Sequence, residues 1–284
     1  MCIKLKNDII IIKDEILDML SKEGIISEKD IVYVSGSLVE PVVNADYSDM
    51  GNCSSDIDLF VIMDEKNGRT LGDKLTGYKK EHKITIFQMY NEIGCDIEIF
   101  SKNSVKELSE AINNIQLSNH MRTRNGLKVP EGWSDRDIKS FINRLNYSIP
   151  ISGNEEYHKL KNSINYNKYS QYRIRRLTNE IDNIISDIWG NLSRNTFDTC
   201  VFLVREAYLK LMELILYRVG QTVDRDKWVS YKFMRMVEIF PEYEPYREIY
   251  KTIFLEQLED YEYGKQCIVK AVECINEFFI DVEV

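Results

Sequence analysis

The chain has 284 residues, of which 44% are hydrophobic and 11% aromatic, so it can bury the core of one large domain or of two ordinary ones. Lys and Arg together number 37 against 46 Asp and Glu, which gives a formal net charge of -9. This acidity raises an electrostatic cost for approach to a long nucleic-acid backbone. We therefore expect a folded protein for which nucleic acid is a disfavoured partner.

The six cysteines indicate neither a disulfide framework nor a zinc site, because they include no Cys-x-x-Cys pair and have no His partner at ligand spacing. Acidic residues flank the apolar run at residues 9–12, and no stretch reaches a membrane-spanning length. We therefore expect reduced thiols and a cytoplasmic location without a membrane partner. The cysteines are Cys2, Cys53, Cys95, Cys200, Cys267 and Cys274.

The N-terminal third carries one helix signal followed by strand signals. Apolar residues recur at helical spacing over residues 7–22, and Gly24 follows as a stop. Runs rich in β-branched and aromatic residues then predict strands separated by polar segments. The last two strands are joined by a four-residue loop that ends in Gly94, which is the length of a hairpin connection. The expected strands cover residues 31–34, 58–63, 83–90 and 95–100.

Beyond Phe100 the strand signals end and helix signals follow one another. Capping boxes at Ser104 and Ser134 predict two helix starts, and polar breaks at residues 122–132 and 148–154 are candidate domain boundaries. The fold class we expect is α+β, with a small mixed β-sheet and flanking helices followed by an all-α helical bundle. The domains would cover residues 1–125 and 126–284, with helical patterns at residues 155–188, 196–219, 226–239 and 246–279.

The segment that carries most chemical information lies within residues 32–63. An apolar strand leads into Gly36 and Ser37, and a second strand carries Ser55, Asp56 and Asp58. Side chains at positions i and i+2 of a strand project from the same face, so these carboxylates are about 7 Å apart along the backbone. Paired carboxylates suit Mg²⁺, which completes its shell with water and substrate phosphates, and glycine lets backbone approach a ligand closely. The pattern indicates phosphoryl or nucleotidyl transfer.

Two acids on one strand face are by themselves a weak indication, because such a pair usually belongs to a solvated surface. Here they coincide with the preceding Gly-Ser turn, with Ser55 before the first acid, and with a later strand that carries Asp96 and Glu98. The last two acids are also at i and i+2, so either can be the third acid of a site. We favour Asp96, the first acid after an apolar residue; the alternative for Glu98 is an exposed strand acid.

Together these residues resemble the polymerase-beta-like nucleotidyltransferase superfamily, whose signature is an apolar strand, Gly-Ser, Asp-x-Asp and a third acid on a nearby strand. The resemblance covers roughly residues 25–102. It implies that Gly36 and Ser37, together with Ser55, hold a nucleoside triphosphate. Residues 40–50 make a longer insertion than the compact pattern has, and either cover the nucleotide or decorate the surface.

The same resemblance assigns the acids to catalysis and metal binding. Asp56 and Asp58 would coordinate two Mg²⁺ ions. Asp96 or Glu98 would complete the metal site and take the proton from an acceptor hydroxyl, with Asp96 as the favoured third ligand. Such a site stabilises both the attacking oxygen and the leaving pyrophosphate of an in-line displacement.

A catalytic domain followed by a helical domain is similar to the small-molecule nucleotidyltransferases, such as the kanamycin- and lincosamide-modifying enzymes of antibiotic resistance. In them the helical domain binds substrate and closes one side of the cleft; no motif for a particular antibiotic is present here, so the resemblance is architectural. Lys227 and Lys232 would neutralise triphosphate charge, and Ser230 would add a hydrogen bond. The alternative is a helix N-terminus with Trp228 in the core.

The expected function is Mg²⁺-dependent transfer of a nucleoside monophosphate from ATP or another nucleoside triphosphate to a hydroxyl of a small molecule. Two alternatives stay open: a nucleotidyltransferase that modifies a protein or a transfer RNA, as in toxin and antitoxin systems, and a non-catalytic nucleotide-binding protein. The acidity of the chain argues against transfer RNA. The acceptor, the preferred base and the formation of a homodimer have no sequence signature.

Overall fold

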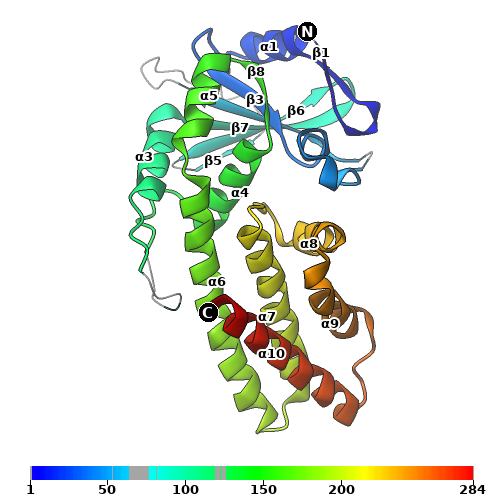
Figure 1. Ribbon diagram of the computed structural model, residues 1–284. Coiled ribbons are helices and arrows are strands. Elements are labelled where there is room, and N and C mark those ends of the chain that lie inside the picture. The colour runs from blue at the N-terminus through cyan, green and yellow to red at the C-terminus, as the bar shows by residue number, and fades with distance from the viewer. Residues whose placement is uncertain are drawn as a thin grey trace. The chain divides into compact units, whose positions relative to one another are not determined.

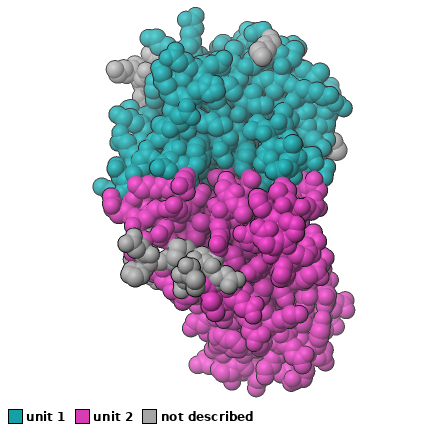
Figure 2. Space-filling view, in the orientation of Figure 1, with its two compact units in different colours: residues 1–114, 127–166 teal, residues 115–126, 167–284 magenta. Residues whose placement is uncertain are grey.

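The computed structural model describes residues 2–52, 54–63, 77–80, 82–118, 122 and 126–283. The chain divides into two compact units, one of Met1–Asn114 with Leu127–Tyr166 and one of Ile115–Gly126 with Asn167–Val284 (Figure 2). The first unit contains the main sheet, and the second is built from helices (Figure 1). The α+β fold class predicted from the sequence, with a small mixed sheet, flanking helices and a C-terminal helical region, is confirmed.

A mixed sheet of six strands forms the centre of the first unit. Its strands are β3 Ile31–Ser35, β4 Ile57–Met63, β5 Gly77–Lys79, β6 Lys83–Tyr90, β7 Ile93–Ser101 and β8 Ile149–Ser152. Their order is β5-β6-β7-β4-β3-β8, and β4 pairs with β7 in parallel while the other neighbours are antiparallel. The parallel pair lies at the centre, so two strands that are distant in sequence run side by side there.

One face of the sheet is covered by α1 (Lys13–Lys22) and by a separate hairpin of β1 (Cys2–Lys4) and β2 (Ile10–Ile12). Val34, Leu59 and Ile97, each from a different strand, belong to one apolar core with Ile16 and Leu20 of α1. Burial of such side chains contributes about 25 cal/mol per Å² of apolar surface. This layer stabilises the unit and leaves the charged strand positions to the opposite face.

The opposite face carries aromatic side chains and is covered by α4 (Asp135–Asn146) and α5 (Asn154–Ser163). Phe60 stacks with Tyr33 and Phe100, at ring-centre distances of 5.0 and 6.3 Å. Phe141 of α4 meets Phe100 edge-on at 5.0 Å. The ring centre of Tyr157 of α5 lies 5.8 Å from the ring centre of Tyr33. Such pairs are worth about 0.5–1.5 kcal/mol each beyond the area they bury, so α4 and α5 are firmly part of this layer.

Shorter helices and one longer helix complete the first unit. The strand β3 is followed by α2 and η2, whose residues connect it to β4, and β7 is followed by α3. Ser101 caps α3 by accepting a hydrogen bond from the Ser104 N–H. These elements are η1 Lys6–Asp8, α2 Glu40–Val43, η2 Ala45–Tyr47 and α3 Lys102–Asn113.

The second unit is a set of packed helices with its own core. Leu211 and Ile215 of α7, Phe233 of α8 and Ile268 of α10 are fully buried. α7 packs against α8, α9 and α10. Within the part of the chain that the structure describes, no helix combines the length and apolarity needed to cross a membrane. The helices are α6 Tyr166–Leu192, α7 Phe197–Arg218, η4 Asp226–Trp228, α8 Val229–Ile239, η5 Pro241–Tyr243, α9 Glu244–Leu255 and α10 Tyr261–Glu283.

The four predicted strands are present, but two local predictions in the N-terminal third are wrong. Residues 7–12 are not part of the expected α-helix, which begins at Lys13; Asn7 and Asp8 adopt positive φ values of 59° and 57°, and the chain then forms β2 against β1. The predicted four-residue hairpin loop is shorter, because β6 and β7 are linked by Asn91 and Glu92 alone. Both residues have positive φ, 49° and 66°, as a two-residue type I′ turn requires.

Strand β8 contradicts the expectation that only helices follow Phe100. It pairs with β3 at the edge of the sheet, where Pro150 is tolerated because an edge strand has one side without ladder partners. Because β8, α4 and α5 pack on the sheet, residues 127–166 belong to the first unit. This division differs from the domain boundary predicted after residue 125, and residues 123–125 lie outside the described part of the chain.

The predicted helix starts are correct in one case of two. Ser134 caps α4 as expected and accepts a hydrogen bond from the Asp137 N–H. Helix α3 begins earlier than its Ser104 capping box predicts, with Ser101 as the N-cap. The helical pattern over residues 155–188 is interrupted near Ile164, which has an extended conformation and separates α5 from α6.

We expect Glu92→Gly to stabilise the protein by roughly 0.5 kcal/mol. A left-handed conformation costs a non-glycine residue about 1–2 kcal/mol, and the greater freedom of glycine in the unfolded chain offsets part of that relief. Urea denaturation followed by circular dichroism measures the change. Glu92→Ala is the matched control, since it removes the same exposed carboxylate but keeps the β-carbon, and it should give no gain. Equal stabilisation by both variants would show that charge, not backbone strain, matters here.

Candidate functional site

The acids predicted from the sequence lie together on one face of the parallel strands β4 and β7. The register pairs Asp58 directly with Asp96, and the carboxylate of Asp56, which precedes β4, lies beside Gly94. Glu98 follows two positions after Asp96, so strand alternation puts it on the same face. Neighbouring strands are about 4.8 Å apart, which brings these carboxylates within reach of one another. The face they share is the aromatic one, opposite the α1 core.

Two glycines make room for the carboxylates. A β-carbon on Gly36 would lie 1.9 Å from Asp58 Oδ2, and a β-carbon on Gly94 would lie 2.2 Å from Asp56 Oδ1. Both distances are far below van der Waals contact, so each carboxylate occupies space that a larger residue would fill. Gly36 also has a φ of 88°, a conformation that favours glycine. The Gly-Ser turn therefore has a direct structural connection with the acids.

A buried arginine that no sequence motif marks contacts these acids. Arg144 of α4 is 3% exposed, and its Nη1 lies 3.0 Å from Asp58 Oδ1 and 3.6 Å from Glu98 Oε1. Its guanidinium carbon lies 5.4 Å from the centre of the Phe60 ring, which is within cation–π range. A buried charge without a partner is strongly destabilising. Asp58 and Glu98 thus provide Arg144 with acidic partners, and Arg144 compensates part of their charge.

Lys83 extends the charge network from Glu98 to the first turn of α4. Its Nζ lies 2.9 Å from Glu98 Oε2 and 3.6 Å from Asp137 Oδ1. Lys80 Nζ lies 3.1 Å from the same Asp137 oxygen. Burial raises the pKa of the Asp137 carboxyl, but hydrogen bonds from Ser134 and Lys80 and the charge of Lys83 outweigh it and hold that pKa below its usual value. Asp137 is therefore an ionised partner of both lysines.

Asp96 and Glu98 have different surroundings, and this bears on the identity of the third acid. Asp96 is paired with Asp58 across the two strands. The two carboxylate oxygens of Glu98 each lie near a cation, Oε2 near Lys83 and Oε1 near Arg144. A carboxylate held between two cations is less available to a metal ion. Glu98 is therefore a charge partner of both cations, and the choice of Asp96 as the third acid stays a prediction.

Ser35, the last residue of β3, fixes the end of α4 beside the acids. Its Oγ lies 2.6 Å from the carbonyl oxygen of Arg144 and 2.8 Å from that of Tyr147. The register pairs Ser35 itself with Asp58. The end of α4 is thus fixed to β3, next to Asp58. Because the backbone at Arg144 is fixed, only the Arg144 side chain can change the position of the guanidinium.

The turn at Gly36 and Ser37 leads into the insertion noted in the sequence. The Gly36 carbonyl accepts two backbone hydrogen bonds that start α2. Gly51 has a φ of 74°, and a β-carbon there would lie 2.6 Å from the Ser37 carbonyl oxygen, so the segment returns to pack on the turn. Tyr47 within it is 1% exposed. The insertion is therefore a packed part of the unit, and a role in covering nucleotide stays a prediction.

Ser55 lies close to the acids, whereas the predicted ligands of the helical half belong to the second unit. The Ser55 Oγ accepts a hydrogen bond from the Asn52 N–H at 3.1 Å, one residue before Asp56. Ser230 is partly exposed at the start of α8 in that unit. The structure therefore brings Gly36, Ser37 and Ser55 near the acids, and describes Lys227, Ser230 and Lys232 as members of a different unit.

The two lysines of the helical half differ in exposure. Lys227 is exposed, with its Nζ 5.0 Å from the centre of the Trp228 ring. Lys232 is fully buried, and its Nζ donates a hydrogen bond to the Thr222 carbonyl at 2.8 Å. Burial of the ammonium group inside the helical unit argues against the predicted phosphate contact of Lys232. The ammonium group of Lys227 is exposed and therefore accessible to a phosphate group.

The pKa of the Cys95 thiol, on the opposite face of β7, is affected by the charge of the acids. Burial raises the pKa of its thiol to about 12, and Asp58, Asp96 and Asp56 contribute in the same direction. The three carboxylates are thus close enough to act on a common group. A thiol with so high a pKa carries no nucleophilic thiolate near neutral pH.

The carboxylates fit a hard divalent cation in chemical type. Asp56, Asp58 and Asp96 offer oxygen ligands, and the missing β-carbons of Gly36 and Gly94 give two of these side chains their space. Among the residues that the structure describes, no three acidic, His or Cys side chains converge as a ready set of metal ligands. With Arg144 on one oxygen of Asp58, seating a metal requires side chains to turn while the strand pairing stays in place.

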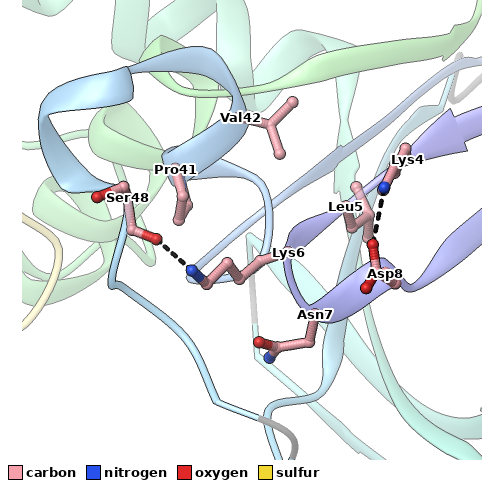
Figure 3. A pocket seen from close by; sticks show the side chains of 8 residues that line it. All are labelled: Lys4, Leu5, Lys6, Asn7, Asp8, Pro41, Val42 and Ser48. Carbon is pink, nitrogen blue, oxygen red and sulfur yellow. Dashed lines mark hydrogen bonds and ion pairs between the residues drawn. The ribbon is translucent and has the colours of Figure 1, made fainter.

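A separate open hollow of about 620 Å³ lies beside the β1–β2 hairpin (Figure 3). Its two lysines are engaged: Lys4 pairs with Asp8 at 2.7 Å, and Lys6 donates a hydrogen bond to the Ser48 carbonyl (Figure 3). The hollow shares no lining residue with the acidic face. Its lining consists of Lys4, Leu5, Lys6, Asn7, Asp8, Pro41, Val42 and Ser48.

Similarity to known proteins is found in solved structures. No protein-family profile matches the sequence, and no protein of curated function matches it. A nucleotidyltransferase-like protein from Exiguobacterium sibiricum is similar in structure, with 10% sequence identity and a TM-score of 0.47. The alignment covers 92% of this chain and 73% of that one. The case for a function therefore depends on the acidic face itself.

We expect Gly94→Ala to weaken binding of a divalent cation about tenfold or more, because its β-carbon would displace the Asp56 carboxylate from its position. Gly94 lies within β7, so the strand should tolerate alanine and the melting temperature should change little. Titration with Mn²⁺, followed by the electron paramagnetic resonance signal of the free ion, measures the affinity.

Gly190→Ala is the matched control for this substitution. Gly190 lies on α6, where a β-carbon would meet nothing within 4 Å, so Mn²⁺ affinity should be unchanged and stability should rise slightly. Unaltered Mn²⁺ affinity in Gly94→Ala would show that the position of Asp56 is irrelevant to the metal.

We expect Asp137→Asn to lower the free energy of unfolding by about 1–3 kcal/mol at neutral pH, because it removes the ionised partner of Lys80 and Lys83. Since the folded-state pKa of Asp137 is lowered, its contribution is present above the unfolded pKa of about 3.9 and is lost as pH falls through the folded value. Urea denaturation of both proteins between pH 7 and pH 3 should show the difference shrinking in acid. Asp135→Asn in the same helical turn should cost less; an equal cost would point to a general effect at the helix terminus.

Proposed function

We propose that the chain is a Mg²⁺-dependent nucleotidyltransferase that transfers a nucleoside monophosphate from a nucleoside triphosphate to a hydroxyl of a small molecule and releases pyrophosphate. One observation carries the proposal: Asp58 and Asp96 are paired on two parallel strands beside the Gly36 turn, and the carboxylate of Asp56, just before β4, lies beside Gly94. Carboxylates grouped in this way beside partly exposed backbone suit the binding of a metal–triphosphate complex. An ordinary strand surface would not need glycine at both Gly36 and Gly94.

The proposed roles follow from the positions of the residues. Asp56, Asp58 and Asp96 would hold two Mg²⁺ ions, which when bound supply charge stabilisation to the attacking and leaving oxygens. Asp96 would also accept the proton of the acceptor hydroxyl. Gly36 and Ser37 would bind the triphosphate, since the turn leaves backbone accessible and ends in a hydroxyl-bearing residue. The superfamily resemblance offers Glu98 as an alternative catalytic acid. In this proposal Glu98 would instead contribute indirectly, by holding Lys83 and Arg144 in position.

Further contacts to the nucleotide belong to the same proposal. Ser55 would add a hydroxyl beside the acids, and Lys227 with Ser230 would add charge and a hydrogen bond from the helical unit. Lys232 is not included as a phosphate ligand because its ammonium is buried on the Thr222 carbonyl.

A small hydroxyl-bearing acceptor is favoured over a nucleic acid by the net charge of -9. An antibiotic is one such acceptor. A cytoplasmic location, where nucleoside triphosphates and Mg²⁺ are both present, and assembly as a homodimer are further parts of the proposal. A pyrophosphate-release screen of the four nucleoside triphosphates against hydroxyl-bearing metabolites and antibiotics tests the acceptor class.

A non-catalytic nucleotide-binding protein is the second candidate, and one observation favours it. Arg144 pairs with Asp58, and no three potential metal ligands converge among the described residues. Calorimetry with each nucleoside triphosphate separates the two candidates: binding without pyrophosphate release in any combination supports the second. Labelled nucleotides in cell extract would reveal a protein or transfer-RNA acceptor instead, because the label would then enter macromolecules.

We expect Asp56→Asn and Asp58→Asn each to lower the transfer rate about 100-fold or more, since an amide loses the charge that would hold the metal, an effect worth several kcal/mol. Initial rates of pyrophosphate release at saturating Mg²⁺ measure the loss. Asp18→Asn is a control with the same chemical change on the exposed face of α1, and it should keep full activity. Full activity in both site variants would refute the proposed reaction.

The third acid is distinguished by a parallel pair of variants. Asp96→Asn should be as inactive as the two variants above, whereas Glu98→Gln should retain measurable activity because its partners are Lys83 and Arg144. The reverse order would assign the third-acid role to Glu98.

A further inference from the structure

We infer that Arg144 is an internal counter-ion that occupies the acidic site in the absence of metal, and that metal binding moves its guanidinium from Asp58 to Glu98. The inference rests on the proposed function and concerns the regulation of the same site. Arg144 is therefore a positioning residue: it acts on the carboxylate of Asp58, the proposed metal ligand, and contacts neither substrate nor product.

The geometry of Arg144 carries the inference. A single nitrogen, Nη1, faces both acids, at 3.0 Å from Asp58 Oδ1 and at 3.6 Å from Glu98 Oε1. The closer contact is a hydrogen bond, and the longer one is an ion pair without one. A small rotation of the guanidinium would exchange these two contacts. Arg144 therefore has two acidic partners on one side, of which only Asp58 belongs to the proposed metal ligands.

Glu98 is prepared to receive the guanidinium. Its Oε2 is held by Lys83 at 2.9 Å, which orients Oε1 toward Arg144. Lys83 is in turn placed by Asp137, and both Lys83 and Glu98 are nearly buried. Since neither acid can leave the buried face without loss of its partner, the cation and not the carboxylate is the group that moves.

The backbone that carries Arg144 is fixed, which confines any motion to the side chain. Ser35 Oγ lies within hydrogen-bond distance of the Arg144 and Tyr147 carbonyls, and the Phe60 ring lies under the guanidinium. The guanidinium can slide over the flat ring face while it keeps a favourable cation–π contact. The exchange between acids thus requires no movement of α4.

The consequence is competition between Arg144 and metal for one carboxylate. A cation that neutralises Asp58 must be displaced before a metal ion can use the same oxygen, so Arg144 lowers metal affinity while it stabilises the metal-free protein. Glu98 offsets part of that cost, because it gives the displaced guanidinium a buried partner. Removal of Glu98 charge should therefore weaken metal binding through Arg144, even though Glu98 is not itself a ligand.

The test is a double-mutant cycle with Mn²⁺ alone as the probe and the free-ion electron paramagnetic resonance signal as the readout. We expect Arg144→Met to bind Mn²⁺ about tenfold or more tightly than the wild type, and to melt at a lower temperature without metal. Glu98→Gln should bind more weakly than the wild type, and this weakening should be absent when Arg144→Met is also present. Arg136→Met is the matched control, because Arg136 is an exposed cation on the same helix, and its Mn²⁺ affinity should be unchanged.

The outcomes separate this inference from the proposed function. Equal or weaker Mn²⁺ binding by Arg144→Met, with normal binding by the wild type, overturns the inference and leaves the metal site in place. Tighter binding by Arg136→Met to the same degree also overturns it, since the effect would then be general electrostatics. If neither the wild type nor Arg144→Met binds Mn²⁺, the proposed metal-dependent function fails and the inference fails with it.

A second measurement has its main readout in the wild-type protein and uses variants only for assignment and as a control. In wild-type protein labelled with ¹⁵N-arginine, the Arg144 side-chain Nε–H signal, identified by its loss in Arg144→Lys, should shift when Mg²⁺ is added. The same signal should not shift with Mg²⁺ in Asp58→Asn, where the metal ligand is absent. A signal that stays unchanged in the wild type while Mg²⁺ binds, as shown by calorimetry, overturns the inference.

Discussion

The parallel pairing of β4 with β7 is the constraint on which the acidic face depends. It sets Asp58 beside Asp96 at a strand spacing of about 4.8 Å, where two unit charges repel by about 3 kcal/mol at an effective dielectric constant near 20. A sheet tolerates such neighbours only when cations or hydrogen bonds compensate them. Arg144 supplies that compensation from a helix, so the strand register and the packing of α4 are two parts of one electrostatic arrangement.

Helix α4 can serve this purpose because its apolar and charged residues share a face. Phe141 packs against Phe100 of the sheet, which brings the charged residues before and after it to the same surface. Asp137, one turn before Phe141, meets Lys83, and Arg144, about one turn after it, meets Asp58. The helix thus delivers a negative group where the sheet offers a lysine and a positive group where the sheet offers carboxylates. This matching explains why residues 127–166 pack with the sheet in one unit.

The sequence predicts the acidic face well because that prediction needs only a period of two along a strand and one glycine turn. It cannot reveal Arg144, since the contact depends on which sheet face α4 covers; the one available signal is a charged residue within the stripe of Ile142 and Leu145. Short apolar runs are equally ambiguous. Residues 10–12 fit a helical spacing, yet pairing with β1 makes them a strand, and Pro150 hides the edge strand β8 by its poor strand propensity.

The charged groups around the acidic face are unevenly distributed. Its carboxylates are those of Asp56, Asp58, Asp96, Glu98 and Asp137, and its cations are those of Arg144, Lys83 and Lys80. The named carboxylates exceed the named cations by two, and Asp56 and Asp58 are the ones that lie beside the glycines, whereas the lysines contact Glu98 and Asp137. A divalent cation beside the glycines would balance the network without changing any of its lysine contacts.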